Sequence, residues 1–260
     1  LQEVKPLSVL GVASPVNMNG WSAALVGTLN HIYKYSLYIP IHQQTSGGLA
    51  MFVCVRDDLA PSVSQLSYDK VCTGAGKSCI KGGLGVQFTL GNKTLRLMDA
   101  HLPAHMEKVN ERVRDFKLIN ENLKFPDADI EFMMGDLNFR IDNIRAQTAI
   151  EKKRYKLMLN YDQLHKKLSL DSAFIGWREV ETPKFPPTYK YVVGTSMYSN
   201  KRVPAWTDRI LQKVNDATKM KTCVYTSVPS YTMSDHKPVC AVVDFNVGGL
   251  NEATLCGTRN

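Results

Sequence analysis

The stretch IEFMMGDLNFR, residues 130–140, is an apolar run followed at once by a glycine, an aspartate and an asparagine. Residues 130–134 predict a short buried strand, because the run has strand length and no helical periodicity. Asp136 and Asn138 follow at its end, and side chains two residues apart on an extended strand point the same way. We therefore expect a carboxylate and an amide to be presented together at a strand end, where functional groups are often displayed.

Other segments of the chain also predict strands and helices. Short apolar or alternating runs predict further strands at residues 49–55, 84–90, 94–99, 222–228 and 239–245. Apolar residues spaced three and four apart predict an amphipathic helix over residues 109–123. Weaker helical patterns cover residues 21–33 and 144–168, the latter broken at Asn160 and Asp162. Gly91 and Asn92 predict a hairpin between two of the strands, so the order favours mixed sheets packed face to face with helices outside.

Composition favours a single domain over residues 1–260. Apolar residues make up 44% of the chain and charged residues 22%, and no linker rich in proline, glycine and serine divides it. The six cysteines form no CxxC pair, so we expect them to be reduced and the protein to be cytosolic. The longest apolar runs have strand length, well short of the ~20 residues that span a bilayer.

The formal charge of +8 favours a partner that carries phosphate, because positive potential concentrates anions near the surface. Charge alone does not choose between nucleic acid, anionic lipid headgroups and soluble polyphosphates.

Two metal or nucleotide motifs are incomplete. Residues 74–78, GAGKS, end like a phosphate-binding P-loop, but Val71 stands where that motif needs its first glycine. His101 and His105 have the spacing of zinc ligands on a helix, yet Pro103 disfavours a helix interior between them. Neither a nucleotide P-loop nor a zinc site is expected. A plain phosphate-contacting loop stays open for the GAGKS segment, because its glycines let the backbone approach an anion and Lys77 and Lys81 add positive charge.

Polar side chains gather in separate segments that end strands or lie in loops. These segments are Gln2-Glu3, residues 100–102, 135–140, 204–210 and 234–238. Hydrolysis of a phosphate ester needs charge neutralisation on the phosphate, a positioned water and help for the leaving oxygen. Acids, amides and histidines are the residue types that supply these functions.

Four stretches resemble one family. They are GDLNFRI (135–141), PTYKY (187–191), PAWTDRIL (204–211) and SDHKPV (234–239). Together they resemble the inositol polyphosphate 5-phosphatases, a branch of the endonuclease/exonuclease/phosphatase superfamily. The resemblance implies a DNase I-like four-layer α/β sandwich in which two packed mixed sheets are flanked by helices. It also implies a strand before Glu3, so we expect the 260 residues to lack their first strand.

The resemblance implies roles for individual residues. Glu3 would bind Mg²⁺, Asp136 would orient and deprotonate the attacking water, and Asn138 would fix its position. His101 and His236 would donate to the scissile phosphate, with Asp208 hydrogen-bonded to His236 and Asp235 near the metal and the water. The residues implied near the other ring phosphates are Lys81, Tyr189, Lys190 and Arg209.

The function expected is removal of the 5-phosphate from inositol polyphosphates, phosphoinositides or both, by a monomeric domain that is cytoplasmic, peripheral at anionic membrane surfaces and free of nucleic acid. One alternative is an abasic-site endonuclease of the same superfamily, which would share Glu3, Asp136, Asn138, Asp208 and His236. Another is a catalytically silent phosphoinositide-binding module.

Overall fold

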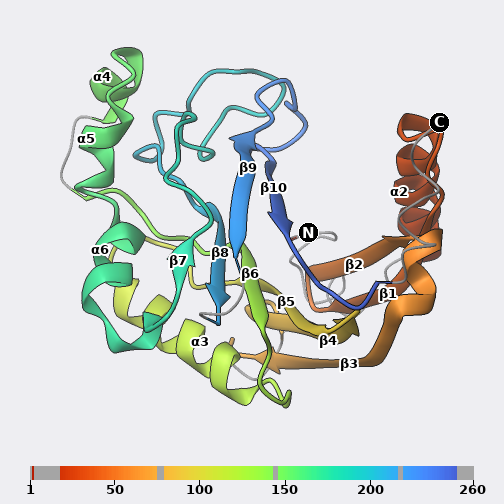
Figure 1. The fold of residues 1–260 in the computed structure, drawn as a ribbon. Coiled ribbons are helices and arrows are strands. Elements are labelled where there is room, and N and C mark those ends of the chain that lie inside the picture. Colours follow the sequence, from red (N-terminus) through yellow and green to blue (C-terminus); the bar gives the residue numbers. More distant parts are fainter. Residues whose placement is uncertain (1, 3–17, 75–78, 143–145, 216–218, 251–260) are drawn as a thin grey trace.

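The computed structural model describes residue 2 and residues 18–74, 79–142, 146–215 and 219–250. The elements in chain order (Figure 1) are α2 (Met18–Ile32), β1 (Tyr38–Ser46), β2 (Leu49–Arg56), η1 (Asp57–Ser62), β3 (Val63–Cys72), β4 (Gly82–Leu90), β5 (Lys93–His101), α3 (Val109–Asn122), β6 (Ile130–Asp136), α4 (Ala146–Glu151), α5 (Tyr155–Leu159), α6 (Gln163–Leu170), η3 (Ser172–Phe174), β7 (Arg178–Glu179), β8 (Asp208–Val214), β9 (Met220–Ser227) and β10 (Val239–Phe245).

The largest sheet has six strands in the order β3-β4-β5-β6-β8-β7. β5 and β6 run parallel, and every other neighbouring pair in this sheet is antiparallel. A parallel pair needs a long crossover connection, and α3 supplies it between β5 and β6. The sheet is therefore mixed, and its two central strands end where the expected site residues begin.

α3 packs closely on one face of this sheet. Phe116, Ile119 and Leu123 are buried along one side of the helical segment, as the amphipathic pattern predicts. A Cβ atom on Gly83 of β4 would lie 2.6 Å from the side chain of Ile119. The glycine therefore allows the close approach of helix and sheet.

The other face of the sheet packs against two antiparallel hairpins, β1–β2 and β9–β10. Buried Leu49 and Met51 of β2 share one core with Leu84 and Val86 of β4. α2 lies against β1 on the outside (Figure 1). The resulting order of α3, large sheet, hairpin sheets and α2 confirms the four-layer sandwich, although only the six-stranded sheet is mixed.

The six strands expected from the sequence are present as β2, β4, β5, β6, β9 and β10. β1, β3, β7 and β8 were not expected. β3 is an edge strand with mostly partly exposed or exposed side chains, so it lacks an apolar run. The expected break at Asp162 is confirmed, because its side chain caps α6 by accepting from His165 N at 2.8 Å. No helix in the described part of the chain combines the length and apolar character needed to cross a membrane.

The expectation of six reduced cysteines is wrong for one pair. Cys72 and Cys79 form a disulfide, with 4.5 Å between their Cα atoms. β3 pairs with β4 so that Cys72 lies opposite Gly82, and Thr73 N donates to the Lys81 carbonyl at 3.0 Å, which brings Cys72 close to Cys79. The spacing of seven residues does not reveal this pairing. Cys54, Cys223 and Cys240 are free thiols, and Cys256 lies outside the described residues.

Candidate active site

Asp136 and Asn138 form one polar unit at the end of β6. The amide Nδ2 of Asn138 donates to Asp136 Oδ2 at 2.8 Å and to the carbonyl of Leu102 at 3.0 Å, and its backbone N–H donates to Asp136 Oδ1 at 3.0 Å. The side chains meet as expected, but the reason given for it was wrong. Asn138 has a φ of +56°, a left-handed conformation, so the chain turns back on Asp136 instead of continuing extended.

Asp136 is held as a carboxylate by the cations around it. Burial alone would raise its pKa, but the hydrogen bond with His101 and the charges of His236 and Lys81 outweigh burial and hold the pKa well below its ordinary value. His101 Nε2 lies 3.3 Å from Asp136 Oδ2, and the ammonium of Lys81 contacts the same nitrogen.

His101 is buried behind Asp136 at the end of β5. Its contact with the carboxylate makes it a support for Asp136 in this structure. The expected donation from His101 to the scissile phosphate stays a prediction.

Arg140 is a site residue that the sequence reasoning did not identify. Its guanidinium donates through Nη2 to Asn138 Oδ1 and through Nε to the Asn138 carbonyl at 3.1 Å. These contacts fix the orientation of the amide, so that Nδ2 faces Asp136. The guanidinium also lies 4.5 Å from the ring centroid of Tyr189. The feature of the sequence that could have identified Arg140 is its position two residues after Asn138.

Asp208 and His236 form the second polar unit. Asp208 begins β8, and His236 lies in the loop before β10. His236 Nδ1 is 3.1 Å and 3.0 Å from the two carboxylate oxygens of Asp208, as the resemblance implied. Thr188 and Thr207 donate to Asp208 Oδ2 at 2.6 Å and 2.9 Å, and neither threonine was identified from the sequence.

The charge of His236 follows from this pairing. Burial would lower its pKa, but the attraction and hydrogen bond of Asp208, together with the charges of Asp136 and Asp235, raise the pKa of His236 to about 10. The imidazole is therefore a cation at neutral pH. Its other nitrogen, Nε2, makes no hydrogen bond within the described part of the chain.

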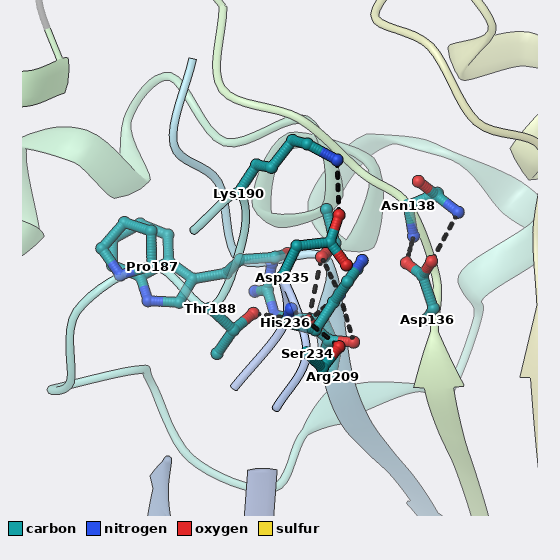
Figure 2. A network of polar contacts seen from close by, with 12 residues as sticks. Asp136, Asn138, Pro187, Thr188, Lys190, Arg209, Ser234, Asp235 and His236 are labelled. Carbon is teal, nitrogen blue, oxygen red and sulfur yellow. Dashed lines mark hydrogen bonds and ion pairs between the residues drawn. The ribbon is translucent and has the colours of Figure 1, made fainter. Parts of the chain in front are cut away.

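The two units face each other because β6 and β8 are neighbours. Asp136 and Asp208 are register partners in the antiparallel pair. One ligand atom each from Asp136, Asp208 and His236 lie within 4.8 Å of one another. Figure 2 shows Asp136 with Asn138 on one side and His236 with its partners on the other.

Tyr189, Lys190 and Asp235 lie beside this pair of units. The Tyr189 ring packs against the His236 imidazole, with 4.5 Å between centroids. The ammonium of Lys190 is bonded to the carboxylate of Asp235, which raises the pKa of Lys190 (Figure 2). The structure thus brings all three expected residues together, and Asp235 is engaged by Lys190.

Arg209 is the expected substrate contact that the structure contradicts. Its side chain is 0% exposed and forms ion pairs with Asp162, at 3.0 Å, and with Glu179. Successive side chains on a strand point to opposite faces, so Asp208 faces the site while Arg209 faces the core. Arg209 therefore stabilises the fold and is not available to a substrate.

Glu3 and residues 75–78 of the GAGKS segment lie outside the described residues. The expected Mg²⁺ ligand and the phosphate-contacting part of that loop therefore stay predictions.

The chain is similar to known proteins over most of its length. The sequence profile of Endonuclease/Exonuclease/phosphatase family 2 matches residues 1–242. The type II inositol 1,4,5-trisphosphate 5-phosphatase of Mus musculus is 31% identical over 224 residues, which cover 79% of this chain and 22% of that protein. This chain thus spans about a fifth of the length of that relative.

Two solved structures share the fold. The inositol polyphosphate 5-phosphatase domain of SPsynaptojanin, in complex with inositol (1,4)-bisphosphate and calcium ion, has a TM-score of 0.81 and 26% identity, covering 94% of this chain and 74% of that one. A Cimex nitrophorin, as a ferrous NO complex, has a TM-score of 0.71 and 23% identity, covering 88% and 81%. The second likeness concerns the fold alone, so the chemistry must be argued from the side chains.

Proposed function

Because the chain belongs to Endonuclease/Exonuclease/phosphatase family 2, we propose that it is a phosphoric monoester hydrolase. Its substrates would be inositol polyphosphates, phosphoinositides or both, from which it removes the 5-phosphate by direct attack of water. The observation that carries the proposal is the pair of units across β6 and β8, an ionised Asp136 with Asn138 facing a protonated His236 with Asp208. The names of the mouse and SPsynaptojanin relatives supply the substrate class.

Asp136 and Asn138 would hold the attacking water. Two oxygens of an ionised carboxylate accept hydrogen bonds from a water, while an amide fixes its position without taking its proton. The cations that lower the pKa of Asp136 make it a weak base in the free protein. A bound phosphate group brings negative charge that offsets these cations, which raises the basicity of Asp136 when substrate is present.

His236 would bind the phosphate. Asp208 holds Nδ1, so the cationic ring presents Nε2 as a donor. A charge-assisted donor that is fixed before the reaction stabilises the negative charge that develops on phosphate oxygens. Thr188 and Thr207 keep Asp208 in place and therefore keep the ring in orientation.

The donor set of the site fits a divalent cation that prefers oxygen. The carboxylates of Asp136 and Asp208 lie close together, whereas the protonated His236 cannot act as a metal ligand. We propose that Glu3 holds Mg²⁺, so that Asp136 stays available as the base for the attacking water. A bound Mg²⁺ would supply charge neutralisation on the phosphate.

Lys190, with Lys81 and Tyr189, would recognise the phosphates that neighbour the scissile one. Lys190 is bonded to Asp235 in the free protein, so its ammonium is already positioned at the mouth of the site. A lysine binds phosphate as a point charge, which suits a ring that carries several phosphates.

Release of inorganic phosphate tests this function. The purified chain is assayed on inositol 1,4,5-trisphosphate, on a phosphoinositide in vesicles and on abasic DNA, each with Mg²⁺ and with EDTA. We expect phosphate release from inositol substrates that needs Mg²⁺ and no cleavage of the DNA. DNA nicking without phosphate release would assign the site to the endonuclease branch, and binding without turnover would make the chain a silent binding module.

A further inference from the structure

Two exposed loops next to the site form a single projecting surface, which we call the paired-loop tip. It consists of residues 192–197 and 228–233, at the top of Figure 1. Its exposed apolar side chains are Val192, Val193, Met197, Val228, Tyr231 and Met233. Met233 is 79% exposed, Met197 65% and Val193 59%. Large apolar side chains this exposed are costly on a soluble surface when they gather in one place.

A buried lysine ties the two loops together. The ammonium of Lys237 donates to the carbonyl of Tyr231 at 2.6 Å and to that of Thr195 at 3.4 Å, one from each loop. The ammonium also lies 4.6 Å from the ring centroid of Tyr191. A buried charge needs such partners, so its contacts hold the loops in a fixed relation.

The loops also bond directly to each other and to the site. Gly194 N donates to the carbonyl of Thr232 at 2.7 Å, which joins the loops. Tyr191 N donates to the carbonyl of Asp235 at 2.9 Å, and Ser199 N to that of Lys190 at 2.8 Å. The paired-loop tip is therefore continuous with the residues at the mouth of the site.

The charges around the tip have one sign. Residues 191–203 and 228–233 contain no aspartate or glutamate, whereas Lys201 and Arg202 are exposed beside the tip. Apolar side chains flanked by cations fit the boundary of an anionic bilayer, where the apolar groups enter the acyl region and the cations meet lipid phosphates.

We propose that the paired-loop tip docks the protein on an anionic lipid bilayer and so places the site over a phosphoinositide headgroup. This rests on the proposed function, because docking serves catalysis only if the substrate is presented by the membrane. The bilayer fits better than a protein partner because the apolar side chains stand on two joined loops whose sequences contain no acid, beside the exposed cations Lys201 and Arg202.

Vesicle binding by a tip variant tests the proposal. In the variant, Met197→Ser and Met233→Ser remove one apolar side chain from each loop. In the matched control, Leu170→Ser and Ile175→Ser remove side chains that are 84% and 76% exposed, at the end of α6 and directly after η3. Figure 1 shows α6 well away from the loops of the tip. Cosedimentation uses vesicles of phosphatidylcholine alone or with phosphatidylserine, and turnover is measured on inositol 1,4,5-trisphosphate and on phosphoinositide in vesicles.

We expect the tip variant to bind phosphatidylserine vesicles about tenfold more weakly than the wild type, because apolar burial is lost, and the control to bind as the wild type does. Turnover of vesicle substrate should fall in parallel, and turnover of soluble substrate should not change. Met197→Trp with Met233→Trp should strengthen binding, because tryptophan favours the membrane interface.

Two results would overturn the docking role. One is equal vesicle binding by the tip variant, the control and the wild type. The other is a wild-type chain that stays in the supernatant, which would assign the tip to a protein partner. Vesicle binding that depends on the tip in a chain without any turnover would support docking and overturn the proposed function instead.

Discussion

Asp208 holds His236 with both of its carboxylate oxygens, 3.1 Å and 3.0 Å from Nδ1. Burial works against a charged imidazole here, but the carboxylate outweighs it and raises the pKa of His236 to about 10. The ring is therefore a fixed cation over the whole neutral range. A phosphate group arriving at Nε2 meets a donor that needs no reorganisation.

The pH dependence of activity should reflect the protonation of His236 in its pair with Asp208. The pKa of His236 is raised, so its charge and the stability it contributes are fully present below about 6.5, the ordinary value, and are lost as pH rises through about 10. We expect an alkaline limb of kcat/KM near pH 10 in the wild type. In Asp208→Asn the alkaline limb of kcat/KM should move towards pH 6.5, the ordinary pKa of a histidine. A limb that stays in place would show that Asp208 does not set the charge of His236.

Asp208 and His236 should also act as one unit in catalysis. His236→Ala should lower kcat by about 10²–10³, the usual loss for a fixed donor to developing negative charge. Asp208→Ala should cause a similar loss, and the double variant should be little worse than the worse single variant. The measurement is a double-mutant cycle on kcat/KM. Strictly additive losses would contradict the pairing as a functional unit.

Lys190→Ala should change selectivity more than rate. The substitution removes a charged contact that only substrates with a neighbouring phosphate can make, so KM should rise for these and change little for substrates without it. Lys184→Ala is the matched control, because Lys184 is an exposed lysine of the same region that also pairs with an acid, Glu181. If KM rises equally for substrates with and without the neighbouring phosphate, Lys190 does not recognise that phosphate.

Arg209→Met should destabilise the fold. The substitution leaves the buried carboxylates of Asp162 and Glu179 without their partner, and breaking a buried ion pair costs about 3–5 kcal/mol. Urea unfolding measures this loss, with Arg178→Met, an exposed arginine of β7, as the control. A variant of unchanged stability and raised KM would instead restore Arg209 to the substrate site.

Residues at strand ends could be predicted from the sequence because their signal is local. Asp136 follows an apolar run, and the PAWTDR and SDH stretches carried the resemblance that joined Asp208 to His236. The contacts of Arg209 could not be predicted in this way, because its partners, Asp162 and Glu179, lie 47 and 30 residues away in the chain. Only the alternation of β8, a strand that the sequence did not reveal, separates Arg209 from Asp208.

Long-range packing also hid other features. Cys72 and Cys79 meet because β3 pairs with β4, and no spacing rule in the sequence predicts that pairing. Lys237 has the same sequence signature as a surface lysine, yet it is buried beneath two loops. Asn138 lies where it was expected, but its backbone adopts a left-handed conformation. The neighbouring residues in the sequence do not require this conformation.

Isotope transfer from solvent tests the central claim most directly. The reaction is run on inositol 1,4,5-trisphosphate in ¹⁸O-labelled water with Mg²⁺, using the wild type, Asp136→Asn and the exposed-acid control Asp127→Asn. Direct attack of water on phosphorus predicts one ¹⁸O in the released phosphate, none in the inositol product, and loss of the 5-phosphate. Asp136→Asn should lower the rate by about 10²–10⁴ while the control keeps it, because the base that orients the water is removed. Label in the inositol product, loss of a different phosphate, or full activity of Asp136→Asn would contradict the account.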